Sequence, residues 1–165
     1  MGSHRKREFL DSLCKEISLQ KTYLKSKEIK TLYFGGGTPS ILNHKELSQI
    51  FTVIYENYTI STDCEITFEC NPEDLDLEKL KILYNSGVNR LSIGVQSFNN
   101  EELKFMNRNH DCLKAIEAIN LAKKVGFNNI SIDLIFSLPD QMIKNWEENI
   151  NIAIDLDVQH ISTYS

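Results

Sequence analysis

Three polar side chains stand at or near the ends of three separate β-favouring segments. Glu69 follows EITF, Gln96 follows RLSIGV, and Asp133 lies within NISIDLIF. Carboxylates accept hydrogen bonds from an amine or a ribose, and a glutamine amide both donates and accepts. An unpaired charge in an apolar strand is costly, so Asp133 needs either a ligand or a basic partner. These side chains suit recognition of a small molecule that carries an amino group and hydroxyls.

A glycine-rich loop follows a fourth segment of the same kind. In TLYFGGGTPS, residues 31–40, three glycines precede Thr38 and Pro39. A simple turn usually needs one or two glycines, so the third indicates close approach of the backbone to another group. Pro39 fixes its own φ and makes the exit of the loop rigid. A ligand loop and a tight turn both fit this stretch taken by itself.

Gln96 and Glu69 could also have purely structural roles. Gln96 could be a buried amide satisfied by the backbone. Glu69 could cap the next helix, but three acidic residues are better placed for that role, namely Glu73, Asp74 and Asp76.

Other candidate residues are open in the same way. Arg108, in FMNRNH, could form a fork-shaped bond to a carboxylate or could be solvated on the surface. His110 is expected at a helix entry or on the surface, because no second histidine stands nearby. Three aromatic residues are expected in the core, namely Tyr33, Phe34 and Phe68.

The segments that must position these residues alternate along the chain between the sequence pattern of a helix and that of a strand. Apolar spacing predicts helices around Leu10–Ile17, from Asn43 (capped with Glu46) to Tyr58, from Leu77 to Gly87, from Leu113 to Gly126, and from Pro139 and Asp140 to Ile154. β-Favouring runs predict strands at 31–34, 65–70, 90–97, 129–136 and 159–165. Strands that alternate with helices indicate parallel βαβ units, so a doubly wound sheet and a (β/α) barrel both fit.

The strands themselves separate these two architectures. Their apolar residues alternate with small or polar ones, as in Thr67 and Glu69, Ser92 and Gln96, and Ser131 and Asp133. Parallel strands covered on both faces usually read as continuous apolar runs instead. We therefore expect Ile66, Ile93 and Ile132 to face helices and the polar residues to line a common interior. A barrel or partial barrel fits best, with its ligand at the mouth formed by the strand ends.

Composition limits the function classes. The chain has 165 residues, of which 41% are hydrophobic and 25% charged, and it carries a net charge of -5. This predicts one folded domain and excludes a general nucleic-acid surface. No apolar run approaches the ~20 residues of a membrane span, and no signal peptide is recognisable, so a cytoplasmic location is expected. Residues 1–7 are interpreted as a tag remnant, leaving 8–165 as the domain.

The four cysteines show no metal-binding spacing. They stand at positions 14, 64, 70 and 112, and no CxxC or CxxxC occurs. We expect structural thiols rather than a zinc or cluster site.

Four stretches together closely resemble radical S-adenosylmethionine proteins. These are YFGGGTPS, EITFECNPEDL, GVNRLSIGVQSFNNEELKFMNRNH and NISIDLIFSLP. The specific likeness is to the oxygen-independent coproporphyrinogen III oxidase-like group, which includes the HemW-type heme chaperones, and it covers residues 8–165. It implies a partial (β/α) barrel whose glycine loop lies against the methionine moiety of S-adenosylmethionine. It also implies that the cofactor is contacted by Gly36, Gly37, Thr38, Glu69, Gln96, Arg108 and Asp133.

One departure from this group concerns the iron–sulfur cluster. The group's cluster loop, CxxxCxxC, follows its first barrel strand and supplies three thiolates to a 4Fe–4S cluster, whereas this sequence has no such motif. We therefore expect a core segment that lacks the first strand, the cluster loop and the C-terminal domain of its parent. The strand TLYF would then be an unpaired edge that invites self-association.

The resemblance implies two roles for the parent protein. In an oxidase, reduction of S-adenosylmethionine at the cluster gives a deoxyadenosyl radical that attacks the propionates of coproporphyrinogen III. A chaperone binds heme and transfers it, and the resemblance is nearer to this branch. Whether the chain is an enzyme stays open, and alone it is expected to hold no cluster, to bind the cofactor weakly and to be inactive. The alternatives are a barrel that binds a phosphorylated metabolite at the glycine-rich loop, which two nearby carboxylates oppose, or an inactive structural fragment.

Overall fold

The computed structural model describes residues 3–26 and 28–165, and within them five strands form one sheet. Their order across the sheet is β1-β2-β3-β4-β5, and each pair from β2 to β5 is parallel. The bounds are β1 (Glu28–Phe34), β2 (Thr59–Cys70), β3 (Arg90–Gln96), β4 (Ile130–Ile135) and β5 (His160–Tyr164). All five predicted strands are confirmed, and β1 and β2 begin earlier than the sequence pattern indicated.

The helices alternate with these strands along the described residues. They are α1 (Ser3–Leu19), α2 (His44–Asn57), α3 (Leu77–Asn85), α4 (Asn100–Phe105), α5 (Cys112–Val125) and α6 (Ile143–Asp155). Two short 3-10 turns, η2 (Pro39–Ile41) and η3 (Pro72–Asp74), follow β1 and β2, and a third, η1 (Gln20–Thr22), follows α1. α1 includes part of the stretch interpreted as a tag remnant, and that interpretation stays a prediction.

Local sequence signals explain where several helices begin. Asn43 and Glu46 form the predicted capping box at the start of α2. Asp76 caps α3 by accepting from the N–H of Lys79. The prediction that Pro139 and Asp140 open the last helix is wrong, because α6 begins at Ile143. Asp140 has a φ of 60°, and a residue in this conformation does not continue a right-handed helix.

The chain divides into two compact units. The N-terminal unit comprises the described residues up to Leu32 together with Leu42–Glu65, and α1 packs against α2 within it. Leu10, Leu47 and Ile50 are buried there, as the apolar stripes predict. The site unit comprises Tyr33–Ile41 and Ile66–Ser165 and contains every predicted site residue.

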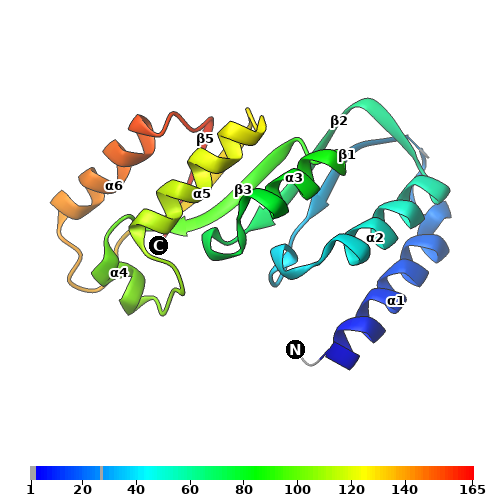
Figure 1. The fold of residues 1–165 in the computed structure, drawn as a ribbon, viewed down its shortest axis with the longest axis horizontal. Coiled ribbons are helices and arrows are strands. Elements are labelled where there is room, and N and C mark those ends of the chain that lie inside the picture. The colour runs from blue at the N-terminus through cyan, green and yellow to red at the C-terminus, as the bar shows by residue number, and fades with distance from the viewer. Residues whose placement is uncertain (1–2, 27) are drawn as a thin grey trace. The chain divides into compact units, whose positions relative to one another are not determined.

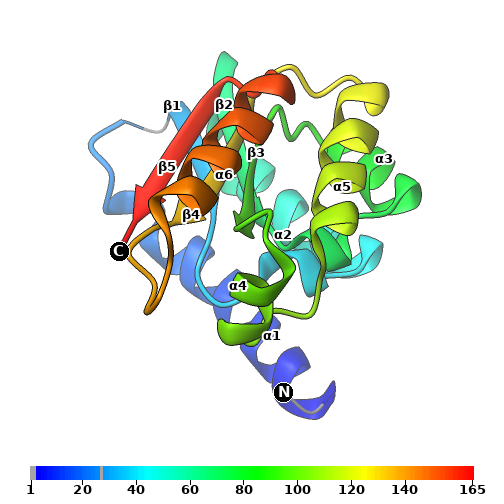
Figure 2. The same cartoon turned by 90° about the vertical axis from the view of Figure 1, so that its left-hand side faces the viewer.

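The sheet of the site unit has an apolar face and a polar face. Figures 1 and 2 show α3, α5 and α6 along one face of its strands, and Ile66, Ile93 and Ile132 are buried there as predicted. Cross-strand partners share a face, and Glu69 pairs with Ser92, which in turn pairs with Ser131. The predicted alternation is therefore confirmed, and the polar row crosses three adjacent strands.

The sequence also led to expectations about the edge of the sheet and about membrane spans. β1 stands at one end of the strand order, so it is an edge strand. Self-association through this edge stays a prediction, which light scattering over a range of concentrations would test. None of the helices in the described residues is long and apolar enough to cross a bilayer.

Candidate functional site

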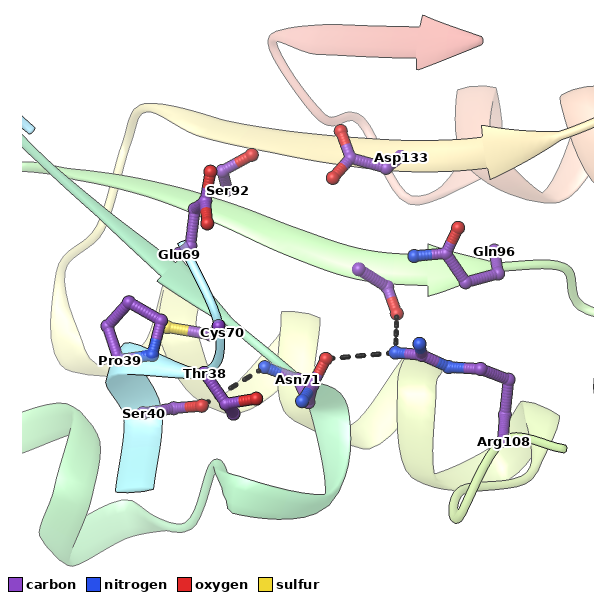
Figure 3. A pocket seen from close by; sticks show the side chains of 12 residues that line it. Thr38, Pro39, Ser40, Glu69, Cys70, Asn71, Ser92, Gln96, Arg108 and Asp133 are labelled. Carbon is purple, nitrogen blue, oxygen red and sulfur yellow. Dashed lines mark hydrogen bonds between the residues drawn. The ribbon is translucent and has the colours of Figure 1, made fainter. Parts of the chain in front are cut away.

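A cavity opens at the carboxyl ends of the strands in the site unit (Figure 3). Its volume is about 190 Å³, so it would hold one end of a nucleoside-sized molecule rather than enclose it. Six of the seven predicted site residues line it, and the exception is Gly36. The full lining is Gly37, Thr38, Pro39, Ser40, Glu69, Cys70, Asn71, Ser92, Gly94, Gln96, Arg108 and Asp133.

Glu69 is held from both of its carboxylate oxygens. Tyr33 donates its hydroxyl to Oε1 at 2.7 Å, and the backbone N–H of Gly36 donates to Oε2 at 3.0 Å. The glycine loop therefore contacts the site through Glu69, and the positive φ of Gly36 and Gly37 (76° and 59°) requires glycine there. The loop is thus a tight turn, and its role as a ligand loop stays a prediction.

Tyr33 was expected in the core, and this prediction is wrong. The side chain is 57% exposed, because it lies on the polar face opposite Glu69. Partial burial, together with the hydrogen bond to Glu69 and the charge of that carboxylate, raises the pKa of Tyr33 to about 12. Tyr33 therefore stays a hydrogen-bond donor to Glu69 at all physiological pH values.

Asp133 is the second carboxylate of the cavity. Burial, followed by the negative charge of Glu69, raises its pKa, while a hydrogen bond from Ser162 and the charge of Arg90 oppose this shift. Asp133 thus has a hydroxyl partner in Ser162, and Arg90 acts on it through its charge. Two carboxylates whose charges repel each other favour a ligand that brings positive charge.

Arg108 lies on the opposite side of the cavity and is not a solvated surface residue. Its Nη2 donates to Asn71 Oδ1 at 2.9 Å and to the carbonyl oxygen of Gly94 at 3.3 Å. Its buried Nε has no hydrogen-bond partner among the described residues. A guanidinium that is held in place and lines the cavity is suited to a carboxylate or a hydroxyl.

Sequence reasoning missed several lining residues. Asn71 stands two residues after Glu69, so the alternation that selected Glu69 could have found it. Ser40 donates to Asp74 at 2.6 Å and accepts from the N–H of Asn71, which ties η2 to η3. No sequence signal pointed to Ser40, because this contact joins segments that are far apart in the chain.

Gln96 enters the cavity from an irregular strand end. Its φ is 69°, and the register between β3 and β4 shifts between Ile93 and Gln96. A Cβ atom placed on Gly94 would lie 2.9 Å from Gln96 Nε2. The Gln96 amide therefore folds back over Gly94, where a Cβ atom would force it to move.

His110 stands directly before Asp111, the N-cap of α5, as the helix-entry prediction had it, but it is buried, so the surface alternative is wrong. Its Nε2 lies 3.0 Å from the carbonyl oxygen of Val95, and its Nδ1 lies 2.8 Å from Glu73 Oε2. Glu73 therefore binds His110 rather than capping α3, which Asp76 does alone. The histidine joins η3 to the end of β3, which local sequence does not reveal.

The arrangement suits a polar organic cation with further hydrogen-bonding groups. The cavity combines two carboxylates and an amide from the strands with a guanidinium from the segment between α4 and α5. No cluster of three or more His, Cys, Asp or Glu side chains in the described part of the chain could hold a metal ion. Cys70 lines the cavity, but burial raises the pKa of its thiol well above the ordinary value, which keeps it protonated.

Comparisons with known proteins identify the family of the chain. The family described as the Radical SAM superfamily matches residues 11–153. The heme chaperone HemW of Bacillus subtilis is 40% identical over 159 residues, which are 96% of this chain and 42% of that protein. The oxygen-independent coproporphyrinogen III oxidase of Salmonella typhimurium is 33% identical over 162 residues, which are 98% of this chain and 35% of that protein. The chain thus spans about two fifths of these relatives.

Solved structures show the same fold. The coproporphyrinogen III oxidase HemN of Escherichia coli, described as a radical SAM enzyme, superposes with a TM-score of 0.89 at 32% identity, over 98% of this chain and 38% of that one. Archaeal Elp3 of Methanocaldococcus infernus has a TM-score of 0.70 at 19% identity, over 92% of this chain and 40% of that one, which supports the fold alone. The predicted partial (β/α) barrel is confirmed.

Proposed function

We propose that this chain, which belongs to the radical S-adenosylmethionine superfamily, is the segment that binds S-adenosylmethionine in a protein of heme or porphyrin metabolism. One observation carries the proposal. The two carboxylates and the guanidinium that the sequence singled out line one cavity beside the glycine loop. S-adenosylmethionine bears an ammonium, a sulfonium, a carboxylate and a ribose, and the side chains of the cavity complement each of these.

Each side chain has a chemical role in this proposal. Glu69 and Asp133 would accept hydrogen bonds from the ammonium group or the ribose hydroxyls. Arg108, which lines the cavity, would donate to a carboxylate or a hydroxyl through its guanidinium group. Gly37 and Thr38 would place backbone and hydroxyl groups against the methionine part. The bound cofactor supplies a sulfonium whose reductive cleavage begins radical chemistry in the family.

The iron–sulfur cluster of the family needs ligands that this sequence does not have. No CxxxCxxC motif occurs in the 165 residues. The family implies a 4Fe–4S cluster in the parent protein, and we propose that its thiolates come from another part of that protein. The residues of this chain would bind and orient the cofactor without supplying electrons to it.

The competing proposal of a phosphorylated metabolite is weaker for two reasons. An anion site at a glycine loop needs free backbone N–H groups, but Glu69 accepts the N–H of Gly36. Glu69 and Asp133 would also repel a phosphate. The loop is thus arranged around a carboxylate rather than around a bound anion.

Calorimetric titration of this chain with S-adenosylmethionine tests the proposal. We expect weak but saturable binding, because each contact in an open cavity contributes about 1 kcal/mol net. S-adenosylhomocysteine, which lacks the sulfonium charge, should bind more weakly, and ribose 5-phosphate should not bind. Binding of the phosphate alone would support the metabolite barrel, and binding of neither would support an inactive structural fragment.

A second experiment separates cofactor binding from radical chemistry. This chain, and a longer form that includes an upstream CxxxCxxC segment, would be reconstituted with iron and sulfide without oxygen. We expect cluster absorption and 5′-deoxyadenosine only from the longer form. A stable cluster on this chain would contradict the division of roles, and failure of both forms would contradict the proposed cofactor.

The choice between a heme chaperone and a coproporphyrinogen III oxidase follows the higher sequence identity. The heme chaperone of Bacillus subtilis is 40% identical and the oxidase of Salmonella typhimurium is 33% identical. We infer a heme chaperone role for the parent protein, and we place coproporphyrinogen III oxidation second. Heme titration of the longer form, followed by absorption, should show binding. Conversion of coproporphyrinogen III without heme binding would reverse the order.

A further inference from the structure

Gln96 has a strained backbone at the edge of the cavity. The N–H of Ser97 donates to the carbonyl oxygen of Val95 at 2.9 Å across a Gln96 φ of 69°. This is a γ-turn with positive φ, the rare and strained form of the two. The other non-glycine residues with positive φ in the described part of the chain are Asn107, Asp140 and Asp157, whose types tolerate it, and Ser137, which like glutamine is not such a type. Such a conformation persists only where the surroundings hold it.

The first anchor acts on the residue before Gln96. The side chain of His110 is buried, and its Nε2 donates to the carbonyl oxygen of Val95 at 3.0 Å. Glu73 binds the other ring nitrogen at 2.8 Å and fixes the ring orientation. The Val95 oxygen thus accepts from both His110 and Ser97, which sets the peptide plane that leads into Gln96.

The second anchor acts on the residue after Gln96. The buried hydroxyl of Ser97 donates to Glu102 Oε2 at 2.6 Å and accepts from the N–H of Asn99 at 2.9 Å. Asn149, from α6, donates to the same Glu102 oxygen at 3.2 Å and accepts from the N–H of Phe98 at 2.6 Å. This buried network joins β3, α4 and α6 directly beside the strained turn.

We propose that His110 and Glu102 are positioning residues that hold Gln96 in its strained turn and so direct its amide over Gly94 into the cavity. The ligand in this inference, S-adenosylmethionine, comes from the proposed function. The strained turn itself does not depend on that function. Neither residue lines the cavity, so each acts through Gln96. The turn thus fixes where on the cavity side of the strand the Gln96 amide lies, which is directly over Gly94.

A double-mutant cycle tests the positioning role on this chain. The variants are His110→Ala, Gln96→Ala and the pair, with His110→Gln in case the alanine form fails to fold. We expect either His110 variant to weaken S-adenosylmethionine binding about fivefold, the value of one neutral hydrogen bond, but to have no further effect when Gln96 is already alanine. The unfolding temperature should fall in both backgrounds. Glu102→Ala should behave in the same way.

A matched control separates positioning from general loss of stability. Gln159→Ala removes a side-chain bond to the backbone of Ile130 at the other end of the strands. It should lower the unfolding temperature without changing affinity. Equal loss of affinity on substituting His110 in both backgrounds, or a loss in the Gln159 variant, would overturn the proposal.

The strain can be measured without any ligand. Gln96→Gly and Gln96→Ala remove the same side chain, but only glycine relieves the positive φ, so the glycine form should unfold about 2–4 °C higher. The difference should shrink when His110 is alanine, because the turn can then relax. Equal unfolding temperatures would overturn the inference. If the unaltered chain binds no S-adenosylmethionine, the proposed function fails, while this comparison still decides whether the turn is strained and held.

Discussion

The two ends of the parallel strands in the site unit use amide side chains in opposite ways. At the amino ends, Asn89 and Ile66 exchange two hydrogen bonds, with the Ile66 N–H donating to Asn89 Oδ1 at 2.8 Å. Gln159 and Ile130 repeat the same exchange, with 2.9 Å for the side-chain bond. At the carboxyl ends, the side chains of Asn71 and Gln96 line the cavity instead.

This difference shows at which strand ends the polar groups have all their hydrogen-bond partners and at which they do not. The amino ends close the backbone with short local bonds and stabilise the sheet. The carboxyl ends hold the strained Gln96, the unused Nε of Arg108 and the raised pKa of Asp133. Departures from local rules that cluster at one end of a sheet indicate a binding site.

Replacing Glu69 by glutamine should have the largest effect on the carboxyl end. Gly36 and Tyr33 both donate to this carboxylate, and its charge would face the cation of the ligand. We expect S-adenosylmethionine affinity to fall by tenfold or more, since hydrogen bonds to charged groups contribute about 1.5–3 kcal/mol. Calorimetry measures this, and the exposed Glu147→Gln on α6 is the control. Unchanged affinity would contradict the assigned role of Glu69.

Replacing Gln159 by alanine should affect the amino end alone. The Ile130 N–H loses its side-chain acceptor, and we expect the free energy of unfolding to fall by about 1 kcal/mol. Urea denaturation measures the loss, with the exposed Asn151→Ala as control. Because the site lies at the other strand ends, affinity should stay the same. A matching loss of affinity would remove the distinction between the two ends.

Periodicity in the sequence predicted the fold and the cavity side of each strand, because alternation depends on neighbouring residues. Glu69 and Asp133 were found in this way, whereas Gly36, Gly37, Thr38 and Arg108 gained their expected roles from resemblance. The exposure of Tyr33 and the burial of His110 were missed for one reason. Their partners, Glu69 and Glu73, lie far away in the sequence, and local patterns carry no information about such contacts. The strain at Gln96 likewise depends on anchors from separate elements.

Replacing Gly94 by alanine should have a smaller effect at the carboxyl end. The new Cβ would lie 2.9 Å from Gln96 Nε2, the far end of a flexible side chain that can move away. We expect affinity for S-adenosylmethionine to fall by a few fold, because the displaced amide loses about 0.5–1 kcal/mol of hydrogen bonding. Calorimetry should show no added loss from Gly94→Ala when Gln96 is alanine. An equal loss in both backgrounds would mean that the methyl group blocks the ligand itself.

Replacing Asp133 by asparagine should change the free energy of unfolding least. The direction of this change shows whether Asp133 is kept for binding or for stability. Burial and the charge of Glu69 raise the pKa of Asp133 above its ordinary value of 3.8, so the folded state binds more protons than the unfolded state just above that pH. The ionised carboxylate therefore lowers the free energy of unfolding as pH rises through this range. At pH 7 the asparagine variant should be more stable by less than about 1 kcal/mol, since the side chain is only partly buried. Urea denaturation from pH 3 to pH 7 should show this advantage disappearing at the acidic end, while Glu147→Gln shows no such trend. A variant that is less stable than the unaltered chain at pH 7 would mean that Asp133 is already satisfied without a ligand, and the contrast between the two strand ends would not extend to this residue.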